Sequence, residues 1–245
     1  MRLPLLCSEC ANEGARADDS TVFVPINDTS IYAITCHRGH ATTVVVVESR
    51  YEQLFEIGLS AIIDEYYREA VVSFASSLER FYEFAFYVLA RHAGMGKDLA
   101  AATWKPVARQ SERQLGAFLG VWVSAERTPP VLLDEKVVAF RNEVVHKGKI
   151  PSRHEALQFG DRVLGVIRAA LGRLRETYSE AYVAHSLDEQ LAVLRAPELE
   201  GKKVTRHSLA MALRDLNVDD PTLYDTAFYV RRTESLRRTM TSAAR

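Results

Sequence analysis

Residues Asp134–Pro151 read DEKVVAFRNEVVHKGKIP, and this stretch predicts a helix that contains the candidate catalytic residues. Gly148 and Pro151 are typical of the end of a helix, so the helix is expected to span about residues 132–147. Apolar residues recur at helical spacing and predict one buried stripe, made of Leu133, Val137, Phe140 and Val144. The opposite face is left for polar side chains.

Three polar side chains near the end of this helix are candidate catalytic residues. Asn142 and His146 are four residues apart, so they share a face, and the long Arg141 side chain can reach the same region. An imidazole can move a proton to or from a ribose hydroxyl, and a guanidinium can hold a phosphate and stabilise transition-state charge. Because RNA carries its own 2′-hydroxyl nucleophile, this chemistry needs no metal cofactor.

The residues on either side of this stretch also show helical patterns. Long runs of mixed charged and apolar residues predict four further helices, over 51–64, 67–91, about 104–125 and 154–182, and the first two runs contain no proline. Ser186 and Glu189 have the spacing of a capping box and predict the start of another helix that runs to Leu194. Glu79 is a candidate partner of Arg141 across the bundle. The fold class is therefore mainly α.

The Arg-x₄-His spacing, with Asn142 after the arginine and a Lys-Gly-x-x-Pro sequence after the histidine, resembles the HEPN superfamily. Segments 58–61, 67–71 and 77–83 are similar to the first helices of that domain. The resemblance covers roughly residues 49–182. It implies a HEPN-like four-helix up-and-down bundle that acts as a homodimer.

In that family the motif is the active site of metal-independent endoribonucleases. At the matching positions of this chain, the resemblance implies that Arg141 binds the phosphate, Asn142 gives polar support and His146 transfers a proton. The expected products are a 2′,3′-cyclic phosphate and a 5′-hydroxyl, in a defence, toxin or stress-response setting. Other members use the fold only for RNA binding or dimerisation, and this is the alternative. In HEPN toxins that are paired with a nucleotidyltransferase antitoxin, a tyrosine two residues after the histidine is the target of modification. This chain has Gly148 at that position, so regulation by modification of a tyrosine is not expected.

Residues 141–175 form a basic region beside the motif. They include eight Lys or Arg and three Asp or Glu, in a chain whose formal net charge is −1. Such a region is expected to follow an RNA backbone, with an affinity that falls as salt rises. The candidate RNA-binding residues are Lys147, Lys149 and Arg153.

The N-terminal segment contains all three cysteines of the chain. Cys7 and Cys10 form a C-x₂-C pair, and Cys36 and His40 follow 26 residues later, so together they supply the four ligands of a structural Zn²⁺ site. His37 is the alternative fourth ligand, but it is adjacent to Cys36 and its side chain is expected to point away. A catalytic zinc needs an open position, which four ligands do not leave. The unit resembles a zinc ribbon.

Alternating β-branched and polar residues predict three strands in this segment. A hairpin is expected between residues 21–26 and 31–35, followed by a β-rich run over 41–47. The sequence thus predicts three parts: a zinc ribbon over 1–48, the helical bundle over 49–182 and a helical C-terminal extension over 183–245.

Composition limits the remaining possibilities. The 245 residues are 47% hydrophobic, with 31 Lys or Arg and 32 Asp or Glu, which is typical of a folded globular protein without a globally basic surface. The longest run without a charged residue, 114–125, is too short to cross a membrane, and the first residues do not read as a signal peptide. The protein is expected to be cytoplasmic and to have no membrane contact. Its expected partners are RNA and a second copy of itself, and an unidentified regulator is a further candidate.

Overall fold

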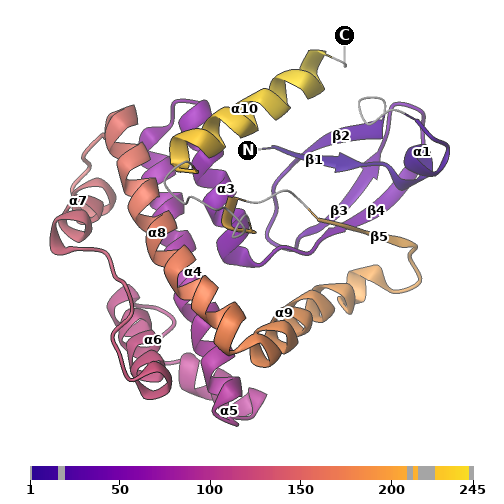
Figure 1. The fold of residues 1–245 in the computed structure, drawn as a ribbon. Coiled ribbons are helices and arrows are strands. Elements are labelled where there is room, and N and C mark those ends of the chain that lie inside the picture. The colour runs from indigo at the N-terminus through magenta and orange to yellow at the C-terminus, as the bar shows by residue number, and fades with distance from the viewer. Residues whose placement is uncertain (1, 16–19, 209–211, 215–223, 243–245) are drawn as a thin grey trace. The chain divides into compact units, whose positions relative to one another are not determined.

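The computed structural model describes residues 2–15, 20–208, 212–214 and 224–242 (Figure 1). The chain forms two compact units. The first, called the metal unit below, contains Met1–Ser49, Asp188–Ala210 and Arg231–Arg245, and the second, the helical unit, contains Arg50–Leu187 and Met211–Val230. The C-terminal residues, predicted as one extension, are therefore divided between the two units.

The metal unit contains two small sheets. β1 (Arg2–Leu6) pairs antiparallel with β2 (Thr21–Pro25), and β3 (Ile31–Thr35) pairs antiparallel with β4 (Ala41–Val46). β5 (Val204–His207) joins the second sheet parallel to β4, although more than 150 residues separate the two strands in the chain. Alternate residues of these strands point inward and form one apolar cluster: Leu3, Leu5, Tyr32, Ile34, Val44 and Val46.

The predicted hairpin of residues 21–26 with 31–35 is wrong. The tight turn lies instead between β3 and β4, where Gly39 has a φ of +83° that a glycine adopts without strain. The Asn27 side chain accepts a hydrogen bond from the backbone N–H of Ser30, which shapes the link between β2 and β3 as a connection between sheets. The sequence analysis missed β1 because the strand is short and contains Pro4, a residue rare inside sheets.

Helices dominate the rest of the described chain, so the predicted mainly α fold is confirmed. The α-helices described are α1 (Ser8–Asn12), α3 (Arg50–Ile63), α4 (Tyr67–His92), α5 (Lys97–Trp104), α6 (Ser111–Glu126), α7 (Glu135–His146), α8 (Arg153–Thr177), α9 (Ser179–Leu194) and α10 (Thr226–Ser242), with short 3₁₀ turns η1 (Pro197–Leu199) and η2 (Ala212–Arg214). None of the described helices is long and apolar enough to span a membrane.

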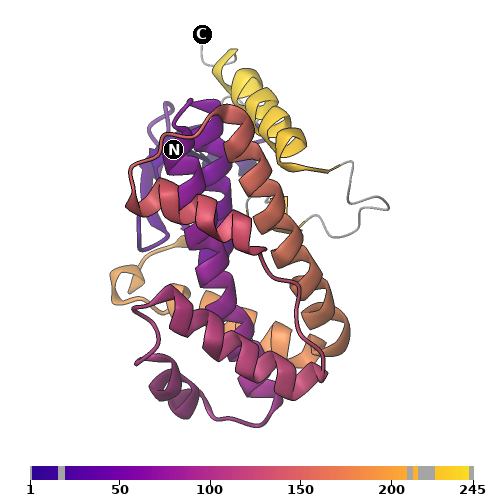
Figure 2. The same cartoon turned by 90° about the vertical axis from the view of Figure 1, so that its left-hand side faces the viewer.

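α4 is the central element of the helical unit, and α3, α6, α7 and α8 all pack against it (Figures 1 and 2). Its fully buried Phe74 ring lies against Phe55 of α3, with the ring centres 4.8 Å apart. Gly58 of α3 and Gly160 of α8 leave room for this ring, because an added Cβ would lie 2.4 Å and 3.0 Å from its carbon atoms. The predicted stripe of α7 is confirmed, since Val144 and its three companions pack against the same core.

Three predicted helix boundaries are wrong. The helix expected over 104–125 begins only at Ser111, because Trp104 is the last residue of α5 and the chain turns between the two. The helix expected over 154–182 ends at Thr177, and α9 begins at Ser179. Ser186 does not cap a helix but lies inside α9. The capping box that the structure contains is at the start of α8, where the Ser152 and Glu155 side chains each accept the other residue's backbone N–H. The Ser-x-x-Glu pattern occurs at both Ser152 and Ser186, but only Ser152 directly follows a proline, which interrupts the preceding helix.

Candidate functional site

Local backbone geometry brings the four predicted metal ligands together. Cys7 caps α1 and Cys10 lies within this short helix, so the first pair sits on a helical turn. Cys36 and His40 bracket the turn between β3 and β4, where the Cys36 N–H donates to the His40 carbonyl oxygen (3.1 Å). The Gly39 N–H closes the turn by donating to the Cys36 carbonyl oxygen (2.9 Å).

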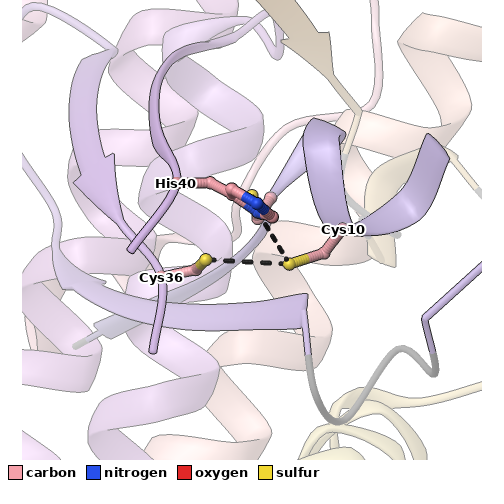
Figure 3. A group of neighbouring side chains, drawn as sticks. Cys10, Cys36 and His40 are labelled. Carbon is pink, nitrogen blue, oxygen red and sulfur yellow. Dashed lines mark hydrogen bonds between the residues drawn. The ribbon is translucent and has the colours of Figure 1, made fainter. Parts of the chain in front are cut away.

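The ligand atoms of this cluster all lie within 4.8 Å of one another. The Cys10 Sγ lies 3.6 Å from the Cys36 Sγ and 3.3 Å from the His40 Nδ1, as Figure 3 shows. The Cys7 Sγ lies 3.9 Å from the same nitrogen. A tetrahedral zinc ion with Zn–S bonds of ~2.3 Å places its ligand atoms ~3.6–3.8 Å apart. The donor set and its spacing therefore fit a metal ion such as zinc.

The surroundings of the thiols differ. Burial, together with hydrogen bonds to the Cys36 and Cys7 thiols, raises the pKa of Cys10 to about 11. Burial acts in the same direction on Cys36, but the backbone N–H groups of His40 and Arg38 outweigh it and lower the pKa of Cys36 to about 7. N–H groups directed at a sulfur favour the thiolate, which is the form that binds a metal.

A carboxylate and a guanidinium that were not expected from the sequence lie on the outer side of the histidine. The Glu13 Oε1 lies 3.7 Å from the His40 Nε2, and the Arg38 guanidinium lies 2.8 Å from the other Glu13 carboxylate oxygen. This leaves Nδ1 directed at the sulfurs. A carboxylate on the outer nitrogen is the usual support of a metal-bound histidine. His37 is exposed and outside the cluster, which agrees with the choice of His40.

The candidate catalytic residues lie on the last turns of α7. Arg141 and Asn142 are half-buried and His146 is exposed. Glu112, at the start of α6, accepts its own backbone N–H and the Ser111 hydroxyl, and these contacts hold its pKa below the usual range, with further lowering by the charges of Arg141 and His146. The guanidinium and the imidazole therefore both lie close enough to Glu112 to act on it.

The support expected from Asn142 is not formed within this chain. Among the described residues, no hydrogen bond joins the Asn142 amide to the His146 ring. The arginine instead faces acidic groups, because Arg141 and Glu79 line the same cavity and the arginine charge acts on the Glu79 carboxyl. Exposed charged residues such as Glu112 are common on helices, so no sequence signal distinguished it.

The three candidate RNA-binding residues differ in their surroundings. Lys147 is exposed just after α7, and Arg153 is exposed at the start of α8. Lys149 instead contacts the carboxylates of Glu155 (3.1 Å) and Glu143 (3.4 Å). Its ammonium is therefore partly neutralised by the protein.

Comparison with known proteins gives no match: no family model, no curated protein and no solved structure matches this chain.

Proposed function

We propose that the protein is a metal-independent endoribonuclease whose active site is formed by Arg141 and His146. One observation carries the proposal. Arg141 and Glu112 line the same cavity, and the charge of the exposed His146, five residues further along α7, acts on the same carboxyl. We place the scissile phosphodiester over this end of α7, between two side chains that differ in the chemistry that they supply.

The reaction is transesterification within the RNA strand. The imidazole of His146 takes the proton of the 2′-hydroxyl, whose oxygen attacks the neighbouring phosphorus. The bond from phosphorus to the 5′-oxygen breaks, and the leaving oxygen receives a proton from a second acid. Arg141 holds the phosphate through its N–H donors and stabilises the charge of the transition state. A cyclic phosphate and a 5′-hydroxyl result.

A homodimer would supply the second acid, because each copy contributes one His146. This part of the proposal is supported by exposed apolar side chains at α7 and next to it. Ile150 is 83% exposed, Val131 is 59% exposed and Val138 is 36% exposed. Large apolar side chains that stay exposed next to a site are candidates for contacts with a second copy.

We propose zinc as the occupant of the cluster in the metal unit, with a structural role as in a zinc ribbon. Four ligands fill the coordination shell of a structural zinc ion and leave no position for a substrate. Metal analysis of the purified protein should give one zinc per chain. Replacement by Co²⁺ should give the visible absorption of a tetrahedral thiolate site.

The test of the nuclease is cleavage of end-labelled single-stranded RNA without added magnesium. Wild-type protein should cleave and leave cyclic-phosphate ends, whereas the Arg141→Ala and His146→Ala variants should be slower by ~10²–10⁴-fold. His154→Ala is the matched control, because it removes an exposed histidine from the start of α8. Strong chelators are omitted, since loss of a structural metal would imitate loss of a catalytic one.

A binding module without catalysis is the second candidate. It is favoured by the carboxyl groups of Glu79 and Glu112 beside Arg141, which offset part of the positive charge that a phosphate needs. If the folded dimer binds RNA equally in the wild type and in His146→Ala but cleaves in neither, this second function replaces the first. Growth of cells that express each form gives a further test, because only an active nuclease should slow growth in a His146-dependent manner.

A further inference from the structure

A cavity of about 130 Å³ lies beside Arg141, inside the helical unit. Residues of α4, α6, α7 and α8 form its walls, and most of the walls are apolar, with Leu78, Leu115 and Phe159 among them. Ser111 and Glu112 of α6 belong to the lining, and three further polar side chains reach the same space: Glu79 and Tyr82 of α4 and Arg141 of α7. The cavity is therefore a narrow apolar slot with polar groups on its lining.

These three polar side chains have hydrogen-bonding capacity that the protein does not use. In the part of the chain that the structure describes, none of Glu79, Tyr82 and Arg141 forms a side-chain hydrogen bond or an ion pair within 4.0 Å. The polar atoms of these side chains stay accessible to solvent. Polar groups that a bound ligand shields from water are normally paired with that ligand. A ligand that fills the cavity would supply the missing partners.

Burial raises the pKa of the Glu79 carboxyl, and the positive charge of Arg141 only partly opposes the effect. N–H donors of a bound ligand would favour the ionised carboxylate and so offset the effect of burial. Burial likewise raises the pKa of the Tyr82 hydroxyl, which therefore stays protonated and can donate a hydrogen bond. The slot thus offers the Glu79 carboxyl as an acceptor and the Tyr82 hydroxyl as a donor, between apolar walls.

We propose that this cavity binds a guanine base. Guanine presents two parallel N–H donors, N1–H and one N2–H, which match the two oxygens of the Glu79 carboxylate. Its O6 lies next to N1–H and accepts a hydrogen bond from the Tyr82 hydroxyl. The flat faces of the base fit apolar walls such as Leu78 and Phe159, and base stacking on side chains of this kind contributes to nucleic-acid binding generally.

The cavity gives the proposed nuclease a substrate preference, and this part of the inference rests on the proposed function. Arg141 lines the cavity and is the residue assigned to the phosphate. A strand with its guanine in the slot therefore has its own phosphates next to the guanidinium. Cleavage is expected beside guanine in single-stranded RNA.

The experiment uses nucleosides, so that it does not depend on cleavage. Ligand-observed NMR with the whole protein compares guanosine with inosine, which lacks only the 2-amino group. Guanosine should bind about 10-fold more tightly than inosine, because the carboxylate loses one of its two partners in inosine. In the Glu79→Gln variant, which keeps the size of the side chain, this difference should disappear. Glu176→Gln removes an exposed carboxylate of α8 that does not line the cavity and should behave as wild type.

The outcomes separate the two proposals. Equal binding of guanosine and inosine, absence of binding by both, or a guanosine preference that survives Glu79→Gln overturns the guanine pocket, whatever the RNA assay gives. Guanosine binding that depends on Glu79, in a protein that cleaves no RNA, supports the pocket and contradicts the nuclease. Cleavage at every base with equal rates leaves the nuclease in place and contradicts the pocket.

Discussion

The two units of the chain are stabilised in different ways. The helical unit has a continuous core around α4 that contains many aromatic rings, including those of Tyr51, Phe55 and Phe74. The apolar cluster of the metal unit contains only six fully buried side chains and lies beside three buried thiols. A core this small leaves a domain marginal, and a bound metal is a common remedy.

Because the two units are stabilised differently, substitutions of their chemically reactive residues should have different effects. In the metal unit, Cys7, Cys10 and Cys36 are buried and are themselves part of the packing. In the helical unit, the last turns of α7 contribute Val144 to the core, whereas His146 stays exposed. A substitution at the first site should therefore alter the fold, and a substitution at the second should alter only chemistry.

Loss of the metal should have the largest effect, and it should be confined to the metal unit. In Cys36→Ser we expect zinc content to fall well below one per chain and amide protection of β3 and β4 to be lost, because structural zinc contributes on the order of 10 kcal/mol. Both tryptophans, Trp104 and Trp122, belong to the helical unit, so their fluorescence reports that unit alone. The tryptophan signal should change little.

His37→Ala is the matched control for this substitution, because His37 is the exposed neighbour of Cys36 and lies outside the cluster. It should retain full zinc content. If Cys36→Ser also kept one tightly bound zinc, the four-ligand site would be wrong.

The second prediction concerns the core of the helical unit. Phe74→Ala should lower the free energy of unfolding by ~3–5 kcal/mol, because it leaves a cavity between α3, α4 and α8. Urea unfolding followed by tryptophan fluorescence measures the loss, while zinc content should stay unchanged. Leu99→Ala, which truncates a side chain that is 60% exposed, should shift stability by less than ~0.5 kcal/mol. Loss of zinc in Phe74→Ala would show that the two units are not energetically separate.

Features set by neighbouring residues could be predicted from the sequence. The apolar stripe of α7 follows from helical spacing, and the four metal ligands follow from the C-x₂-C pair and the short Cys36–His40 turn. Gly148 ends α7 with a φ of +75°, as its residue type predicts. In each case the signal lies within a few residues of the feature.

Features set by distant residues could not be predicted. β5 joins β4 from the far end of the chain, and nothing in residues 204–207 identifies that partner. Glu13 and Glu112 are ordinary exposed acids in the sequence, and only the fold brings them to His40 and to Arg141. The capping box is a local pattern that occurs twice, so its use at Ser152 is decided by the surrounding chain.

Within the metal unit, the carboxylate beside His40 should affect metal affinity but not the fold. Glu13→Gln should weaken zinc binding by ~10-fold, measured by competition with a chelator of known affinity, because the carboxylate no longer supports the outer nitrogen of His40. At saturating zinc the protein should fold as wild type. Glu9→Gln is the control for net charge, since the Glu9 carboxylate pairs with Lys203 at 2.7 Å and the His40 charge is the smallest of the influences on its pKa. Equal weakening by both variants would assign the effect to net charge and not to the orientation of the histidine.

The smallest predicted effect is electrostatic and belongs to the helical unit. Hydrogen bonds from the backbone and side chain of Ser152, and from Lys149, lower the pKa of Glu155 to about 2. Since the pKa is lower in the folded than in the unfolded state, the ionised carboxylate stabilises the fold at neutral pH, and this contribution is lost as pH falls from about 4.5 toward about 2. The side chain is 36% exposed, so solvent screening limits the contribution to ~1 kcal/mol.

Glu155→Ala should therefore lower the free energy of unfolding by ~1 kcal/mol at pH 7, and the difference from wild type should shrink by pH 3. Tryptophan fluorescence restricts the measurement to the helical unit, which avoids interference from acid release of the metal. Glu143→Ala also removes a carboxylate from Lys149 but leaves the helix cap intact, so it should cost only a few tenths of a kcal/mol. A difference that persisted unchanged at pH 3 would mean that Glu155 acts through packing and not through its charge. The helical unit would then depend on its apolar core alone, in contrast to the metal unit, which depends on charged ligands.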